Sequence, residues 1–242
     1  VFFTFYTSSG FVATGRLFES LFGMHYHDAM LWGSVVMLAY TFFGGFLAVS
    51  WSDVLQGSLM LVALVMVAAM GIAMTGGLGD MTVALDARDP ALLDPFVGSD
   101  GQAIGWIGVL SLVAWGLGYP GQPHILARFM AIRNPGEMPT ARRVAMGWVI
   151  VVLVAAIIVG LTGVLLLDPP LAGPDSEKVF IVMSGQYLHP VLAGICMSGI
   201  LAAIMSTASA QLLVASSAFA EDFYKGIFRR NPGRAELLWV GR

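Results

Sequence analysis

Long apolar runs without charge dominate the pattern of this chain. Four of them, 29–52, 54–79, 101–127 and 144–167, contain no Asp, Glu, Lys or Arg. A helix needs about 20 mostly apolar residues to cross a bilayer, so each run is long enough for one crossing. Runs of this length lack the alternation between two faces that is typical of a membrane β-barrel. The pattern therefore predicts transmembrane α-helices.

Two further segments bring the predicted number of crossings to six. Residues 1–22 form one span, and residues 179–220 are uncharged but too long for a single helix. We expect the chain to divide near Pro190 into a short outer helix and a crossing helix. Residues 51–53 are predicted to turn the chain between two closely spaced helices. This places Asp53 at a helix start and leaves no carboxylate inside a span.

The charged residues predict the orientation of these helices. The loops 77–103 and 168–189 hold eight acidic and two basic residues, whereas Arg and Lys gather in and beside 133–143 and 223–242. Basic loops favour the cytoplasmic side. We therefore expect 77–103 and 168–189 to be extracellular and 133–143 and 223–242 to be cytoplasmic, and six alternating crossings satisfy this assignment.

Composition narrows the function class. Hydrophobic residues make up 57% of the chain and charged residues only 11%, against about 25% in soluble domains. No stripe of Lys and Arg with aromatic residues favours nucleic-acid binding. No hydrolase, phosphate-loop or zinc motif occurs, which argues against an enzyme or a bound cofactor. If the chain transports a solute, the energy would come from an ion gradient. The lipid bilayer would surround its helices.

One apolar run is interrupted in its middle. Pro120 and Pro123 cannot donate backbone hydrogen bonds, and several glycines near them weaken the helix further. Broken backbone at membrane depth is tolerated where protein buries it or where it lines a cavity, and in transporters it marks a substrate site. Trp115 and Tyr119 lie one turn apart beside the break. From the residues alone, a simple kink and a binding site are equally good interpretations.

Small and hydroxylated residues distinguish the last span. The hydroxyls of Ser206 and Thr207 lie one helical turn after the carbonyl of Ala203, and oxygen atoms are the ligands that hard cations prefer. Small residues also let membrane helices pack closely. Taken without other information, close packing is the favoured interpretation and a cation site is the alternative.

These two segments resemble a known family. Residues 115–130 (WGLGYPGQPHILARFM) and 200–207 (ILAAIMST) are similar to the broken helix and the sodium-site helix of the sodium:solute symporter family, above all of its proline carriers. Residues 16–20, 40–51 and 221–225 extend the likeness over nearly the whole chain. The resemblance implies an all-α membrane fold with five-plus-five inverted repeats (LeuT type). The chain would be one transmembrane domain over 1–242, holding the third to eighth core helices, and would be truncated at both ends.

The resemblance also implies roles for single residues. The sodium ligands would be Ala203 through its carbonyl and Ser206 and Thr207 through their hydroxyls, completed by a first core helix outside this chain. The positions that match the substrate site are Tyr6, Trp115, Tyr119 and Pro123. Pro120 stands where a proline carrier is expected to have Phe, and a residue before proline favours an extended conformation, which here would be Tyr119.

The function implied is sodium-coupled uptake of L-proline by alternating access in a bacterial cytoplasmic membrane. Sodium would be the coupling ion, with no other cofactor. Two alternatives stay open. A symporter of the same family would carry another small organic solute such as pantothenate, and a symporter-like domain of a membrane kinase would sense a solute. The oligomeric state is not specified by the sequence.

Overall fold

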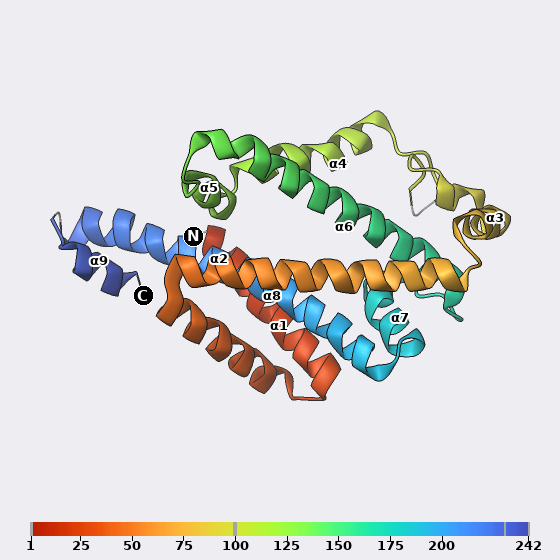
Figure 1. The fold of residues 1–242 in the computed structure, drawn as a ribbon, viewed down its shortest axis with the longest axis horizontal. Helices are drawn as coiled ribbons and strands as arrows, with labels where there is room; N and C mark the ends of the chain where they lie inside the picture. Colours follow the sequence, from red (N-terminus) through yellow and green to blue (C-terminus); the bar gives the residue numbers. More distant parts are fainter. Residues whose placement is uncertain (1, 99–100, 230, 242) are drawn as a thin grey trace. The chain divides into compact units, whose positions relative to one another are not determined.

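The computed structural model describes residues 2–98, 101–229 and 231–241, without the side chains of residues 2–4, 20–22, 115, 174 and 234. The described residues form helices and connecting turns, with one isolated antiparallel bridge between Val97 and Ala103. The predicted all-α class is therefore confirmed. Figure 1 shows the order of the helices along the chain.

The α-helices of the described residues follow one another as α1 (Phe2–Phe22), α2 (Tyr26–Met74), α3 (Leu78–Arg88), α4 (Trp106–Gly118), α5 (Pro123–Met130), α6 (Met138–Leu166), α7 (Val179–Tyr187), α8 (Pro190–Ala218) and α9 (Arg234–Val240). Short 3₁₀ segments cover Pro90–Leu93, Tyr119–Gly121, Pro135–Glu137 and Gly173–Lys178. A π-helical segment, Phe219–Phe228, continues α8.

Three helical stretches among the described residues are long and apolar enough to cross a membrane: Tyr26–Met74, Pro135–Leu166 and Pro190–Phe228. Their surfaces carry large apolar side chains, and Phe43 and Leu55 are 79% and 72% exposed. Contiguous exposed apolar surface on this scale suits lipid rather than water. The six crossings and the two-sided placement of the loops stay predictions.

The chain turns within α2 at a different place from the one predicted. Gly45 has φ +57° and ψ −153°, whereas residues 51–53 continue the helix. Figure 1 shows the ribbon of α2 changing direction in its first half. Glycine adopts a positive φ without steric cost, and nothing in 51–53 breaks a helix. The prediction for 51–53 is therefore wrong, and Asp53 lies well inside a helix instead of at its start.

The division of the long run 179–220 occurs as predicted. Helix α7 ends at Tyr187, Leu188 is extended, and α8 begins at Pro190. Proline suits the first helical position because its fixed φ fits the helix and its missing N–H has no partner there in any case.

The chain folds as two compact units. The first comprises Val1–Met60 and Met197–Arg242, and the second comprises Leu61–Cys196. In the first unit, α1 contacts α8 closely, since a Cβ placed on Gly10 would lie 3.0 Å from the Cβ of Ala208. Small residues at both positions allow this approach.

The second unit has its own apolar core. Val67 on α2, Met183 on α7 and Cys196 on α8 are fully buried and pack with Val159 on α6. The thiol of Cys196 lies 3.9 Å from the carbonyl oxygen of Ala63, and a free cysteine buried in this way packs as a small hydrophobe. This core holds α2, α6, α7 and the start of α8 together.

Candidate functional site

A group of three oxygen atoms lies in the middle of α8. The hydroxyl of Ser206 donates a hydrogen bond to the carbonyl oxygen of Ala203 at 3.0 Å, and that of Thr207 donates to the same oxygen at 3.1 Å. Serine and threonine within a helix commonly reach the carbonyl three or four residues earlier. Both hydroxyl oxygens keep lone pairs that a cation can share. The predicted proximity of these groups is confirmed, whereas their role as sodium ligands stays a prediction.

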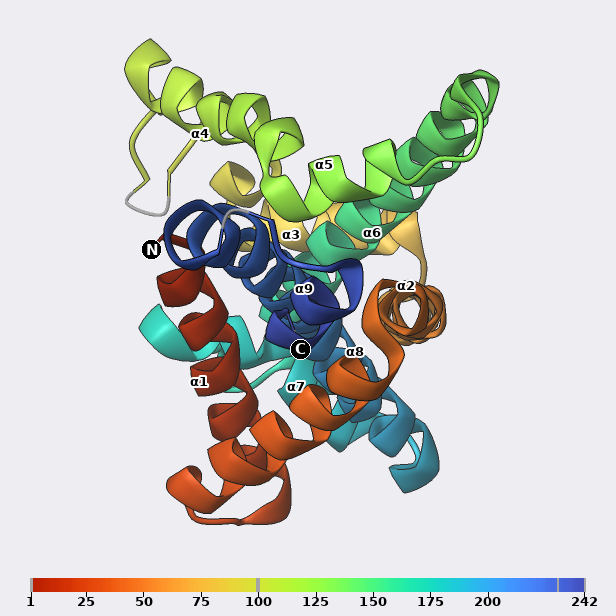
Figure 2. The same cartoon turned by 90° about the vertical axis from the view of Figure 1, so that its left-hand side faces the viewer.

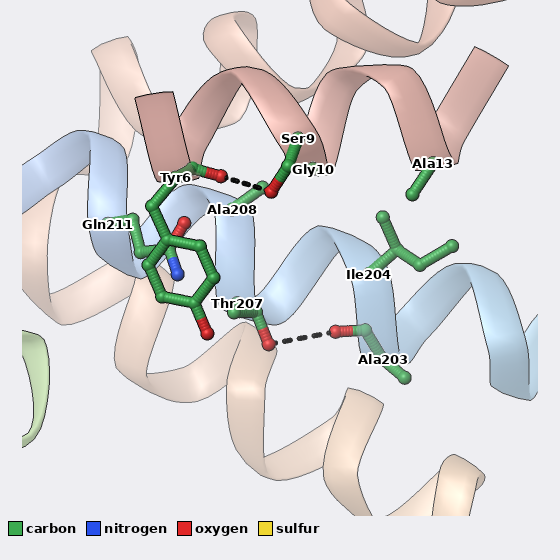
Figure 3. A pocket seen from close by; sticks show the side chains of 9 residues that line it. All are labelled: Tyr6, Ser9, Gly10, Ala13, Ala203, Ile204, Thr207, Ala208 and Gln211. Atoms are coloured by element: carbon green, nitrogen blue, oxygen red, sulfur yellow. Dashed lines mark hydrogen bonds between the residues drawn. The ribbon is translucent and has the colours of Figure 1, made fainter. Parts of the chain in front are cut away.

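A pocket of about 290 Å³ lies beside this group, between α1 and α8 of the first unit (Figure 3). Its lining residues are Tyr6, Ser9, Gly10 and Ala13 of α1 and Ala203, Ile204, Thr207, Ala208 and Gln211 of α8. The pocket therefore joins Tyr6, predicted for the substrate, to Ala203 and Thr207, predicted for sodium. Ser206 is tied to this pocket through the carbonyl that it shares with Thr207.

The described residues that line the pocket include no charged side chain. Its polar groups come from Tyr6, Ser9, Thr207 and Gln211, and Figure 3 shows the Tyr6 ring extending from α1 toward α8. A neutral lining of this kind suits a ligand that has no net charge, or a cation and an anionic group bound together. In both cases the charges of the ligands balance one another, so no buried charge is left unpaired.

Gln211 was missed by the reasoning from sequence. It lies one turn after Thr207, so the two side chains share a face of α8. The residue is only 1% exposed, and its Nε2 has no hydrogen-bond partner among the described residues. The available signal was a lone amide in an apolar membrane helix, since polar side chains at that depth commonly have a function.

The broken segment belongs to the second unit. Helix α4 ends at Gly118, a 3₁₀ turn covers Tyr119–Gly121, and α5 starts at Pro123 after an extended Gln122 with φ −67° and ψ 130°. Figure 2 shows α4 and α5 running in different directions on either side of this break. The predicted interruption of the helix is confirmed.

The local conformation of Tyr119 differs from the expectation. It lies in the 3₁₀ turn, and the N–H of Gln122 donates to its carbonyl oxygen at 3.2 Å. Pro120 is compatible with this turn because the second position of a short helical turn has no N–H bond to lose. The extended conformation expected for Tyr119 is therefore wrong, and the turn satisfies a backbone donor at the break.

The substrate residues predicted at the break lie along one stretch of the second unit. Trp115 is on α4, one turn before Tyr119, and its side chain falls outside the described part of the structure. Tyr119 is 45% exposed, and Pro123 is exposed at the start of α5. Their roles, like that of Tyr6 in the first unit, stay predictions.

A model of the sodium:solute symporter family matches residues 1–242. The chain belongs to this family. As a family member it is a membrane protein, and the predicted class, a LeuT-type symporter fold, is confirmed together with the predicted family.

Curated relatives of this symporter chain are similar along its full length. It is 46% identical over 243 residues to the high-affinity proline transporter PutP of Bacillus subtilis, and 45% identical over 247 residues to the sodium/proline symporter of Escherichia coli. The osmoregulated proline transporter OpuE of Bacillus subtilis is 45% identical over 243 residues. Each match covers 100% of this chain and 48–50% of the relative, so the chain spans about half the length of the curated relatives it matches.

Proposed function

We propose that this symporter takes up L-proline together with sodium across a bacterial cytoplasmic membrane, and that it is not an enzyme. The observation that carries the proposal is the pocket between α1 and α8, where Tyr6 lies beside the hydroxyl of Thr207 and the carbonyl of Ala203. The names of the relatives that are 45–46% identical support proline as the solute and sodium as the coupling ion.

Sodium suits the oxygen group on α8. The carbonyl of Ala203 and the hydroxyls of Ser206 and Thr207 are neutral oxygens that can replace water around a small hard cation. Both hydroxyls now donate their hydrogen to the carbonyl of Ala203. To ligate a cation, each hydroxyl would only have to rotate so that a lone pair faces the ion, and the backbone would stay unchanged. Further ligands would come from a part of the intact protein that is not in this chain.

L-proline suits the polar and aromatic character of the predicted substrate positions. Its ring is apolar, its ammonium group favours aromatic faces by about 0.5–2 kcal/mol, and its carboxylate requires hydrogen-bond donors. Tyr6 offers a ring and a hydroxyl in the pocket, while Trp115, Tyr119 and Pro123 lie at the break of α4 and α5. We propose that each of these four residues takes part in substrate binding in the intact protein.

Coupling follows from a difference in affinity. Sodium can shift a protein between outward-open and inward-open states only if it binds one of them more tightly. We propose that sodium on α8 favours the outward-open state, that proline then binds, and that the helices around the break move to open the inner side.

The test uses the intact protein in proteoliposomes. We expect uptake of radiolabelled L-proline under an inward sodium gradient, and loss of uptake when choline replaces sodium or when an ionophore collapses the gradient. Excess unlabelled proline should compete, and pantothenate should not. Proline uptake without dependence on sodium would overturn the coupling, whereas competition by pantothenate alone would assign another solute.

A further inference from the structure

One buried polar atom in the pocket, the Nε2 of Gln211, has no hydrogen-bond partner among the described residues. Gln211 is 1% exposed, and its Nε2 makes no hydrogen bond to any described residue. Buried amide groups in proteins are almost always paired, because an unpaired donor loses its bonds to water without replacement. A donor kept in this state within a pocket calls for a ligand that carries an acceptor.

The position of Gln211 within the pocket is set by the helix. Ala203, Thr207 and Gln211 follow one another at intervals of four residues, so they form one stripe on α8, and all three line the pocket. A spacing of four residues corresponds to about 6 Å along the axis. Figure 3 shows Gln211 at one end of this stripe, with the Tyr6 ring extending across from α1.

The amide nitrogen can only donate, which restricts the group that it binds. In L-proline the ring carbons are apolar and the ammonium group is itself a donor, so the carboxylate oxygens are the available acceptors. Among the described residues, no Lys, Arg or His lines the pocket to bind that carboxylate instead. A hydrogen bond from a neutral donor to an ionised acceptor is also stronger than one between two neutral groups.

We propose that Gln211 is a substrate-binding residue, and that its Nε2 donates a hydrogen bond to the carboxylate of the transported amino or imino acid. The inference rests on the proposed function and specifies the substrate class at the pocket as a small solute with a free carboxylate. The carboxylate then lies about one helical turn from the oxygens of Ala203 and Thr207, where the cation is proposed to bind. Cation and carboxylate attract each other across this distance in an apolar pocket.

The proposal is tested with Gln211→Leu and Gln211→Glu in the intact protein, with proline uptake measured at saturating sodium. Gln211→Leu removes the donor, and we expect the KM for proline to rise about tenfold, which corresponds to about 1.4 kcal/mol. Gln211→Glu places a second carboxylate against the substrate, so its KM at pH 8 should be higher still. Gln186→Leu makes the same change at an exposed position of α7 and should leave the KM unaltered.

Acidification gives a signature that a purely structural role does not. A protonated carboxyl is a donor, so lowering the pH from about 8 to 5.5 should bring the KM of Gln211→Glu back toward the wild-type value while Gln211→Leu shows no recovery. Equal KM values for Gln211→Leu and wild type would overturn the proposal. Full proline affinity of Gln211→Glu at pH 8 would also overturn it, because the substrate ammonium would then be the group facing this position. Absence of proline uptake in the wild-type protein would instead refute the proposed function.

Discussion

The hydroxyl of Tyr40 donates a hydrogen bond to the carbonyl oxygen of Met205 at 3.3 Å, which ties α2 to α8 within the first unit. Met205 directly precedes Ser206, so the bond holds α2 against the stretch of α8 that carries the oxygen group. The two residues are 165 positions apart in the chain. Helix α2 therefore helps to position the oxygen group on α8, although none of the predicted site residues lies on α2.

Removal of this hydroxyl should weaken sodium binding without touching a proposed ligand. A hydrogen bond of this kind contributes about 0.5–1.5 kcal/mol, so Tyr40→Phe should raise the sodium concentration for half-maximal proline uptake by about two- to tenfold. Tyr187→Phe is the matched control, since it removes a bond to the carbonyl of Leu166 in the second unit. We expect that control to keep the wild-type sodium dependence. A sodium curve for Tyr40→Phe that coincides with wild type would contradict the positioning role.

Thr207 is the most direct test of the sodium site. Thr207→Ala removes one proposed hydroxyl ligand, and a bond from a polar group to a charge contributes about 1.5–3 kcal/mol. The half-saturating sodium concentration should therefore rise at least about tenfold, with less change in the maximal rate at saturating sodium. Thr207→Ser keeps the hydroxyl and should stay near wild type. If both variants respond to sodium like the wild-type protein, Thr207 is not a ligand.

Gly71 marks a close helix contact in the second unit. A Cβ at this position of α2 would lie 2.5 Å from the hydroxyl oxygen of Thr162 on α6, and Thr162 is fully buried. Gly71→Ala should force the helices apart and lower the free energy of unfolding by about 1–3 kcal/mol.

Gly160 on α6 provides the control for this contact, because a Cβ there meets nothing within 4 Å. Thermal denaturation of the detergent-solubilised protein, followed by size-exclusion chromatography, compares the two substitutions. Gly71→Ala should show the lower transition temperature and Gly160→Ala no decrease. Equal stability of the two variants would show that the helix contact at Gly71 tolerates a methyl group.

Glu236 should make the contact between α9 and the segment before it sensitive to acid. Its carboxylate accepts hydrogen bonds from the hydroxyl of Tyr224 at 2.7 Å, from the guanidinium of Arg229 at 2.7 Å and from the N–H of Gly233 at 3.3 Å. The bond from Tyr224 is the main cause that lowers the pKa of Glu236, and Arg229 and Gly233 add to it. These bonds favour the ionised form.

The sign of the pH effect follows from this direction. A lowered pKa means that the stabilisation is present above the ordinary carboxyl pKa of about 4.3 and is lost as the pH falls through the lowered value. Hydrogen exchange of α9, corrected for the intrinsic rate, should therefore be constant from about pH 7 to 5 and increase in stronger acid. Glu236→Gln should exchange faster at neutral pH and lack the acid transition. An identical pH profile in the two proteins would rule out this contribution.

Local patterns in the sequence predicted several features of the fold well. The break at Tyr119–Gly121 follows from prolines that lack an N–H, and the start of α8 at Pro190 follows from the same chemistry. The convergence of Ser206 and Thr207 on Ala203 was also predictable, because a helix places those groups one turn apart. The turn in α2 was predicted at the wrong place. It was expected at the more polar residues 51–53, but it occurs at Gly45, because glycine can adopt the positive φ that the turn requires.

The pattern of residues along the chain was enough to identify a helical membrane protein of a symporter family, with a broken helix and a row of oxygens on α8. These features depend on residues near one another in the chain, where backbone geometry fixes the distances. In contrast, the folded structure was needed to find that Tyr6, Thr207 and Gln211 line one pocket and that Tyr40 reaches Met205. Those partners come from helices distant in sequence, and their meeting depends on how small residues such as Gly10 and Ala208 let the helices approach.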